Sequence, residues 1–344
     1  MSKVPGWRGA RALLACAGLV AGLAALPARA ATTLVINQLL PPGDPLNQQV
    51  LRPWAAEVAR VTDGRVRISL PNAPVAAPQQ LWNAVVGGIV DGAYVYNGLY
   101  PRQLPLEQIT ALPFVGGDAA ATSLALWNTW QKFFAKAGEY RSVKLLALFA
   151  MPSGQVFSLG QPIVQPADLV GRRMWVLPGD PQQILSHSRA GVISSPAVQV
   201  SELVAGKTVD AIAGISSYNV DAFKVMGYMK SETVIPGGLT TPSFSLIVNR
   251  ARWESIAPAD RKAIEAISGA AFARRLAVVA RYGQQARQRG VQGGMKVLQP
   301  SPALLADLRA DSGPLVAQWS QAAQAKGVPA AVALKYFESQ AQAH

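Results

Sequence analysis

The chain has 344 residues, a formal net charge of +13 and an apolar content of 50%, and its length predicts two domains. The Lys and Arg residues are dispersed rather than clustered, which argues against a nucleic-acid-binding protein. The single cysteine, Cys16, lies close to the N-terminus, so the rest of the chain can form no disulfide, thiol nucleophile or thiolate metal site.

The first thirty residues are typical of a secretion signal. Basic residues up to Arg11 precede a short apolar run, and Ala28-Arg29-Ala30 has the form of a cleavage site. We expect cleavage after Ala30, a periplasmic, monomeric mature protein, and a net charge lowered to +9 by loss of the four basic residues in this segment. The residues before Cys16 faintly resemble a lipobox, but the apolar stretch between Arg11 and Cys16 is too short for a signal core.

Hydrophobic periodicity predicts an α/β domain after the signal. Helices are predicted between the strands, with the last of them starting at a capping residue, Asp118. This alternation favours a largely parallel sheet. The predicted strands are Thr33–Gln38, Val66–Leu70, Ile89–Tyr96 and Val143–Phe149, and the predicted helices run from Leu46 to Val61, from Pro78 to Val86 and from Asp118 through Phe134.

The pattern restarts with shorter elements after Met151, which predicts a second lobe. We expect strands at Gln155–Ser158, Arg173–Val176 and Val209–Ile212, a helix from Pro181, and a helical C-terminal third at Pro258–Gln288, Pro302–Lys326 and Pro329–Gln340. The predicted division assigns residues 31–153 and 213–244 to lobe I, 154–212 and 245–300 to lobe II, and 301–344 to C-terminal helices.

Catalytic motifs are poorly supported. Beyond the signal the histidines are His187 and His344, and no G-x-S-x-G sequence is present. Gly206-Lys207-Thr208 resembles part of a P-loop, but the required upstream glycine is replaced by Ser201. Histidines and carboxylates do not cluster at metal-ligand spacing. We therefore expect neither an enzyme nor a bound cofactor or metal.

Six segments carry a family resemblance, one of them Arg250–Ile256, RARWESI, through its tryptophan. Gln161–Asp180 reads QPIVQPADLVGRRMWVLPGD, similar to a "kPi.sp.DLkGlKiRv" pattern, and Leu99–Phe114 reads LYPRQLPLEQITALPF, similar to "Y.p..FPl.....LPF". Leu46–Leu70, Val86–Asp91 and Gly206–Asp210 match in order and spacing. Together they resemble the solute-binding proteins of TRAP transporters, the DctP-type family.

The resemblance implies a two-lobed type II periplasmic-binding-protein fold with a hinge and an interlobe ligand cleft. It also implies a function: a periplasmic receptor binds a small organic acid and delivers it to the membrane subunits of a TRAP permease, which uses an ion gradient. Two alternatives remain. One is a ligand-sensing receptor that is not coupled to such a permease, and the other is a periplasmic α/β enzyme.

Aromatic and amide residues gather where the predicted strands end. Two α/β lobes bind solutes in the crevice outside the carboxyl ends of their strands, so these residues are candidates for ligand contact. The predicted ligand-binding residues are Asn37, Tyr94, Tyr96, Asn97, Gln155, Arg173, Trp175, Ser216, Tyr218 and Phe244.

The chain departs from the family at the position that bears most directly on the ligand. In the family, the strand that corresponds to Arg173–Val176 carries an arginine that clamps the carboxylate, and here that position is Trp175. Gln155 stands where many relatives have a second arginine. Arg173 can supply charge on the same strand face if Met174 points away. The departure favours a larger, less charged or aromatic organic acid.

Overall fold

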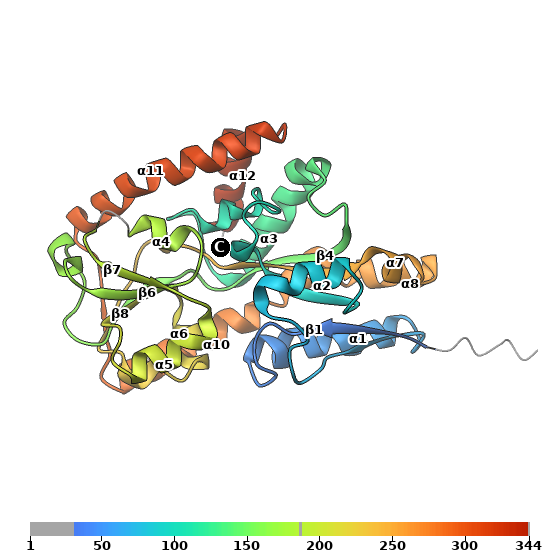
Figure 1. Cartoon of the computed structure of the whole chain (residues 1–344), viewed down its shortest axis with the longest axis horizontal. Helices are drawn as coiled ribbons and strands as arrows, with labels where there is room; N and C mark the ends of the chain where they lie inside the picture. The colour runs from blue at the N-terminus through green and yellow to red at the C-terminus, as the bar shows by residue number, and fades with distance from the viewer. Residues whose placement is uncertain (1–30, 186–187, 343–344) are drawn as a thin grey trace, which may run out of the picture. The chain divides into compact units, whose positions relative to one another are not determined.

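Two mixed β-sheets organise the computed structural model, which describes residues 31–185 and 188–342 (Figure 1). The first sheet has the order β2-β1-β3-β10-β4 and the second the order β11-β9-β5-β8-β6-β7. The predicted cleavage site, Cys16, His187 and His344 lie outside the described residues. None of the helices in the described ranges combines the length and hydrophobicity that a membrane crossing requires.

The first sheet is built mostly from the N-terminal half of the chain. Strand β1 runs parallel to β2 and β3, whereas β10 returns antiparallel between β3 and β4. Its strands are β1 (Thr32–Asn37), β2 (Val66–Ser69), β3 (Gly92–Tyr96), β4 (Val143–Ala150) and β10 (Ser243–Asn249), and the helices on this side are α1 (Arg52–Val61), α2 (Leu81–Val86), α3 (Ala119–Thr129), α7 (Arg250–Glu254), α8 (Pro258–Ala266) and α9 (Gly269–Arg274).

The second sheet repeats this design with shorter strands. Strand β6 is parallel to β7 and β8, β11 is parallel to β9, and β5 is antiparallel to both β8 and β9. Its strands are β5 (Gln155–Ser158), β6 (Arg173–Val176), β7 (Gly191–Ser194), β8 (Ala211–Ile215), β9 (Ser231–Thr233) and β11 (Lys296–Leu298), with α4 (Asp180–Ile184), α5 (Val200–Ala205), α6 (Ser217–Ala222) and α10 (Ala277–Gln292) beside them.

The two C-terminal helices touch both halves. Helix α11 (Pro302–Ala325) packs against α4, and α12 (Ala330–Ala341) packs against α3. In Figure 1 both are drawn in red at the end of the chain. Trp319 on α11 donates its indole N–H to the carbonyl of Leu106 at 3.1 Å. These helices therefore join elements that belong to different sheets.

Two of the three crossings between the sheets lie at neighbouring places. The first crossing follows β4 and the second precedes β10, whereas the third lies between β10 and β11. Gly154 and Thr240, one from each crossing, form an isolated antiparallel bridge, and the hydroxyls of Ser153 and Thr241 lie 3.0 Å apart. The antiparallel strand of each sheet, β5 or β10, is the strand that directly follows a crossing. Two adjacent connections of this kind are the place where a hinge would bend.

Sheet membership differs from the predicted division of the chain. Strands β8 and β9 belong to the second sheet, although residues 213–244 are predicted as lobe I. Helices α7 and α9 pack on β10 and β4 of the first sheet, although they fall within the range predicted as lobe II. The chain crosses back between Thr233 and Ser243 rather than near Ile212. Hydrophobic pattern shows where a strand lies but not which sheet it joins.

The predicted helix Pro258–Gln288 is three helices in the structure. Gly269 has a φ of +52°, which favours glycine, and a β-carbon there would lie 2.5 Å from the Trp127 ring. The helix axis therefore breaks between α8 and α9. By contrast, the predicted bounds of β5 and β6 are confirmed residue by residue.

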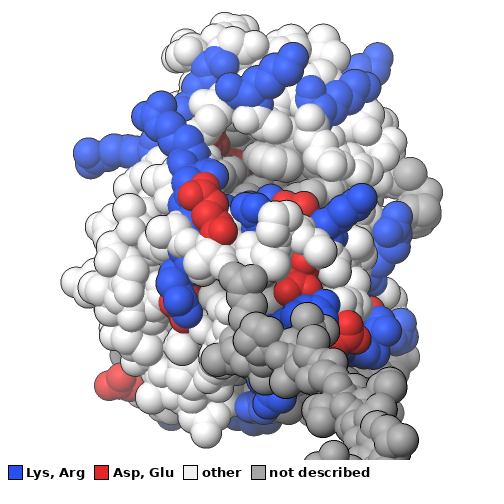
Figure 2. Space-filling model, turned by 90° about the vertical axis from the view of Figure 1, so that its right-hand side faces the viewer, with Lys and Arg blue, Asp and Glu red and all other residues white. Residues whose placement is uncertain are grey.

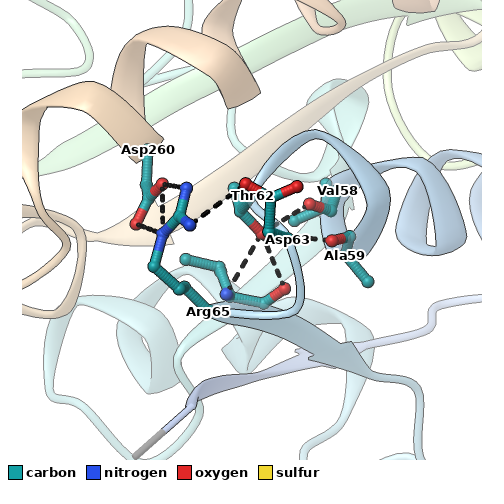
Figure 3. Close-up of polar contacts among 7 residues, drawn as sticks. Val58, Ala59, Thr62, Asp63, Arg65 and Asp260 are labelled. Carbon is teal, nitrogen blue, oxygen red and sulfur yellow. Dashed lines mark hydrogen bonds and ion pairs between the residues drawn. The ribbon is translucent and has the colours of Figure 1, made fainter. Parts of the chain in front are cut away.

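The turn after α1 is fixed by side chains, as Figure 3 shows. Thr62, fully buried, donates its hydroxyl proton to the carbonyl of Val58 at 2.7 Å and accepts the N–H of Val66 at 3.1 Å. The Arg65 guanidinium donates Nη2–H to an Asp260 carboxylate oxygen at 2.9 Å and Nε–H to both oxygens. This bidentate pair joins the turn to α8, which is 195 residues away in the sequence.

Charged side chains are interspersed on the face drawn in Figure 2, where Asp and Glu lie beside several Lys and Arg residues. Ion pairs between distant segments of the fold are also partly exposed to solvent. Arg252 meets Asp91 at 2.6 Å, and Arg173 meets Asp210 at 2.7 Å. Exposed pairs of this kind contribute little to stability.

Candidate ligand-binding site

A cavity of about 70 Å³ lies where the strands of the two sheets end. Its walls come from the segments that follow β1, β6, β7 and β8 and from the ends of β3 and β10. A single buried water needs about 10–15 Å³ by the same measure, so the space suits a small molecule. The cavity lies at the carboxyl ends of parallel strands, where two-lobed α/β proteins bind their ligands.

The lining is almost entirely apolar. Leu39, Leu177, Ile215 and Phe223 are typical of it, with prolines from four of the surrounding segments. Tyr96 and Asn219 are the polar side chains among the described lining residues, and none of those residues carries a charge. Such a surface favours a ligand with a large apolar part and few polar groups.

An aromatic wall stands on the first-sheet side. Phe244 on β10 lies opposite Tyr96 on β3 in the antiparallel ladder, and their ring centroids are 5.6 Å apart. Phe244 also stacks on Phe149, with centroids 5.3 Å apart and ring planes at 15°. Tyr96 and Phe244, two of the ten predicted ligand-binding residues, line the cavity. Alternation along each strand points them toward the same sheet face.

Tyr96 also reaches across to the other sheet. Its hydroxyl donates to the carbonyl of Pro178, directly after β6, at 3.4 Å. Tyr94 lies on the same strand face, but its ring is buried behind the wall. The Tyr94 hydroxyl accepts the N–H of Leu40 at 2.8 Å and donates to Asn47 Oδ1 at 3.0 Å. Burial raises the pKa of Tyr94.

Two of the predicted amides, Asn37 and Asn97, are hydrogen-bonded to neighbouring segments of the protein. Asn37, fully buried, accepts the N–H of Val75 on Oδ1 at 2.6 Å. Asn97 donates Nδ2–H to Ser243 Oγ at 3.0 Å and accepts the Ser245 hydroxyl proton on Oδ1 at 2.6 Å. Neither residue lines the cavity. Their polar atoms are occupied by the protein itself.

Gln155 lies at the first crossing rather than in the lining. Its Oε1 accepts the N–H of Ile235 at 2.6 Å, and its Nε2 donates to the carbonyl of Ser153 at 3.3 Å. The side chain therefore links the two crossings to each other. Alignment with the family predicts that Gln155 contacts the ligand. In the structure its hydrogen bonds connect it to the crossings between the sheets.

Trp175 lies behind the lining. It is fully buried, its ladder partners are Ile193 of β7 and Ile212 of β8, and its indole N–H donates to Ser195 Oγ at 2.9 Å. Leu177, two residues further along the same face, lines the cavity instead. The placement differs from the expected flat wall: Trp175 is the penultimate residue of β6, and the cavity begins only beyond the end of the strand, at Leu177 and Pro178. A ligand-reading role for Trp175 stays a prediction.

Arg173 is farther from the cavity. It begins β6, at the end of the strand opposite the cavity, and its guanidinium donates to both carboxylate oxygens of Asp210 at 3.0 and 2.7 Å. The hydrogen bond from Arg173 lowers the pKa of Asp210. The expectation that Arg173 adds charge to the ligand site therefore has no support in this arrangement.

Tyr218 and Ser216 lie at the start of α6. The Tyr218 hydroxyl donates to Asp44 Oδ1 and accepts the N–H of Leu46 at 2.8 Å, which joins α6 to the loop before α1. Burial raises the pKa of Asp44, and the hydrogen bond from Tyr218 partly offsets this effect. Ser216 donates its hydroxyl proton to Asn219 Oδ1 at 3.0 Å. Both predicted residues border the cavity without lining it.

Sequence reasoning missed most of the apolar lining. The segment Pro196–Val198 after β7 and the pair Leu177-Pro178 after β6 enter the cavity, but prolines and aliphatic residues in connections carry no specific signal. Asn219 was identifiable as a polar residue after a buried strand. The only sequence signal for these lining residues was their position after the end of a predicted strand, because no motif marks them.

A family model covers most of the chain: bacterial extracellular solute-binding protein, family 7 (DctP), matches residues 36–322. A relative from Comamonas testosteroni, named outer membrane transporter protein TsaT, is 37% identical over 334 residues, which is 97% of this chain and 99% of the relative.

Solved structures share the fold. A TRAP periplasmic solute-binding protein from Bordetella bronchiseptica with bound (R)- and (S)-mandelate has a TM-score of 0.84 and 28% identity, covering 90% of this chain and 99% of that one. A TRAP solute-binding protein from Rhodoferax ferrireducens in complex with copurified benzoate has a TM-score of 0.80 and 22% identity, covering 91% and 98%. The second likeness concerns the fold alone.

Proposed function

This chain belongs to the bacterial extracellular solute-binding proteins of family 7, and we propose that its solute is an aromatic acid with a single carboxylate. As a TRAP-type solute receptor it binds a small organic acid for secondary transport. The ligand's ring lies against Tyr96 and Phe244 in the cavity between the two sheets. The lobes close on the ligand by bending at the two adjacent crossings.

The observation that carries this proposal is the apolar and uncharged lining of the cavity. A C4-dicarboxylate has two charged ends, and each is best held by a planar cationic fork. Arg173 is engaged by Asp210 away from the cavity, and Trp175 and Gln155 stand where the family's arginines are expected. An aromatic ring, by contrast, gains free energy from leaving water for such a lining.

The Bordetella bronchiseptica relative supports the same ligand class. Mandelate, which is bound in that structure, has one phenyl ring, one hydroxyl and one carboxylate. Its ring can pack against an aromatic wall, and its single carboxylate needs fewer hydrogen-bond donors from the pocket than the two carboxylates of a dicarboxylate. Mandelate is therefore the reference ligand for experiments on this chain.

We also propose the cellular course of the protein. The chain is exported and cleaved after Ala30, acts as a monomer in the periplasm, and passes its ligand unchanged to the membrane subunits of a TRAP permease. The family's extracellular location and the basic, apolar N-terminal segment support this course. Mass spectrometry of the exported protein identifies the first residue.

The proposed ligand class is tested by thermal stabilisation. A ligand that binds only the folded state at one hundred times its Kd stabilises that state by about 2.7 kcal/mol. We expect mandelate and related aromatic monocarboxylates to raise the Tm, with a rise that grows with the logarithm of ligand concentration above the Kd, and succinate and malate to leave it unchanged. A larger rise with the dicarboxylates would contradict the proposal.

The receptor role is tested in the same samples. Small-angle scattering is expected to give a smaller radius of gyration with mandelate than without it, and the ligand is expected to be recovered unaltered after prolonged incubation. Chemical conversion of mandelate by the purified protein would instead support the alternative of a periplasmic enzyme.

A further inference from the structure

We infer that Asn219 recognises the acidic group of the ligand through its side-chain N–H, in the place of the arginine clamp. This inference rests on the proposed function and makes it more specific. Asn219 is 7% exposed and lies on α6, beside the second sheet. It lines the same cavity as Tyr96 and Phe244, which belong to the first sheet.

The orientation of the amide is fixed by the protein. Its Oδ1 accepts the backbone N–H of Ser216 at 3.2 Å and the Ser216 hydroxyl proton at 3.0 Å. A backbone N–H can only donate, so the oxygen of the amide must face Ser216 and the nitrogen must face away. In the described part of the chain, Nδ2 has no hydrogen bond of its own. Asn219 lines the cavity, so its free N–H group can donate there to a ligand acceptor in place of water.

The rest of the lining gives the ligand's anion few other partners. Tyr96, the other polar side chain, already donates its proton to the carbonyl of Pro178. Carbonyl oxygens, like a carboxylate, only accept hydrogen bonds, so they repel the anion. A carboxylate that places its ring on the aromatic wall therefore finds its donor at Asn219. One neutral donor suits one charge, which is consistent with a monocarboxylate.

Ser216 is a positioning residue in this account. Its two hydrogen bonds hold the amide, but its own atoms do not line the cavity. The capping arrangement at the start of α6, Ser216 with Asn219 three residues later, thus serves both to begin the helix and to direct a donor into the cavity.

Three variants separate ligand recognition from helix capping. Asn219→Asp retains the oxygen that accepts both Ser216 bonds but replaces the N–H donor with a second acceptor. Asn219→Leu removes both functions at similar volume. Ser216→Ala removes one capping bond and leaves Nδ2 in place. Each is measured by calorimetric titration with mandelate and with phenylethane-1,2-diol, in which a hydroxymethyl group replaces the carboxylate.

We expect Asn219→Leu to weaken mandelate binding by about 10- to 100-fold, because a hydrogen bond to a charged group is lost. Asn219→Asp is expected to weaken it by more than about 100-fold at pH 7, through repulsion of like charges, while its affinity for the diol stays within a few-fold of the unmodified protein's. Ser216→Ala is expected to change mandelate affinity by no more than a few-fold.

Unchanged mandelate affinity in Asn219→Asp would overturn the assignment, and so would equal losses for mandelate and the diol. The Asp variant keeps the capping bonds, so the test does not depend on Asn219→Leu folding. If the unmodified protein and both Asn219 variants bind mandelate with equal affinity, the proposed function stands and only the role of Asn219 falls. If the unmodified protein binds no aromatic acid, both fall.

Discussion

Replacing Phe244 by alanine is expected to lower the free energy of unfolding by about 3–5 kcal/mol and also to abolish most of the affinity for an aromatic acid. Phe244 is 6% exposed and packs against the rings of Tyr94, Tyr96 and Phe149. Its removal leaves a void in the first sheet and takes away the central ring of the cavity wall. Aromatic pairs add stabilisation beyond the area that they bury.

The matched control for this prediction is Phe337→Ala. Phe337 on α12 is fully buried, and its ring lies outside the cavity lining. Denaturant titration is expected to show comparable losses of stability in the two variants, whereas calorimetry with mandelate shows a loss of affinity only for Phe244→Ala. Equal affinity in both folded variants would mean that Phe244 is a core residue without a role in binding.

A second large effect concerns a pair of buried carboxyl groups, Glu107 and Glu139. Glu107 is 1% exposed, and Lys326 lies 3.2 Å from Glu139. Within the described residues, neither carboxylate oxygen of Glu107 has a hydrogen-bond partner. Burial, and then the neighbouring Glu139 carboxylate, raise the pKa of Glu107 well above its ordinary value. Glu107 therefore keeps its proton at pH values at which an exposed glutamate has lost it.

The pH dependence follows from this raised pKa. The folded state binds the Glu107 proton more tightly than the unfolded state does, so the stabilisation is complete below the unfolded pKa of about 4.3. It is lost as the pH rises from there through the folded pKa, by about 1.4 kcal/mol per pH unit. Glu107→Gln, which remains neutral and can donate to Glu139, is expected to abolish this loss and to be more stable than the unmodified protein at pH 7.

Denaturant titrations between pH 4 and pH 9 measure this difference. Glu202→Gln, at an exposed position on α5, is the control and is expected to leave the pH profile unchanged. Parallel profiles for the unmodified protein and Glu107→Gln would contradict the raised pKa of Glu107.

The fold was largely predictable because local pattern and family resemblance agree. Alternating strands and helices predicted the α/β class, and the bounds of β5 and β6 follow directly from β-favouring residues between turns. The two-lobed fold implied by the resemblance is confirmed by the family match and the structural neighbours. The sheet to which β8 and β9 belong was not predictable, since that choice depends on contacts between distant segments.

The site was predictable only in part, for a related reason. Tyr96 was identified because it lies at the end of a predicted strand, and Phe244 because it lies on the segment that returns from the second lobe. Trp175 and Arg173 were selected by alignment with the family, but a strand of four residues presents its start and its end to different surroundings. Ion pairing then holds Arg173 away from the cavity, and the indole hydrogen bond to Ser195 holds Trp175 behind it. These partners lie 37 and 20 residues away and leave no local signal.

Calorimetric titration of the unmodified protein with mandelate at a series of temperatures tests the central claim, that an apolar cavity between the sheets binds a singly charged aromatic acid. Burial of a ring in such a cavity gives a negative heat-capacity change. We predict binding with one site per chain, a negative heat-capacity change, and no detectable heat from succinate under the same conditions. Tighter binding of succinate than of mandelate, or a heat-capacity change of zero, would contradict the account.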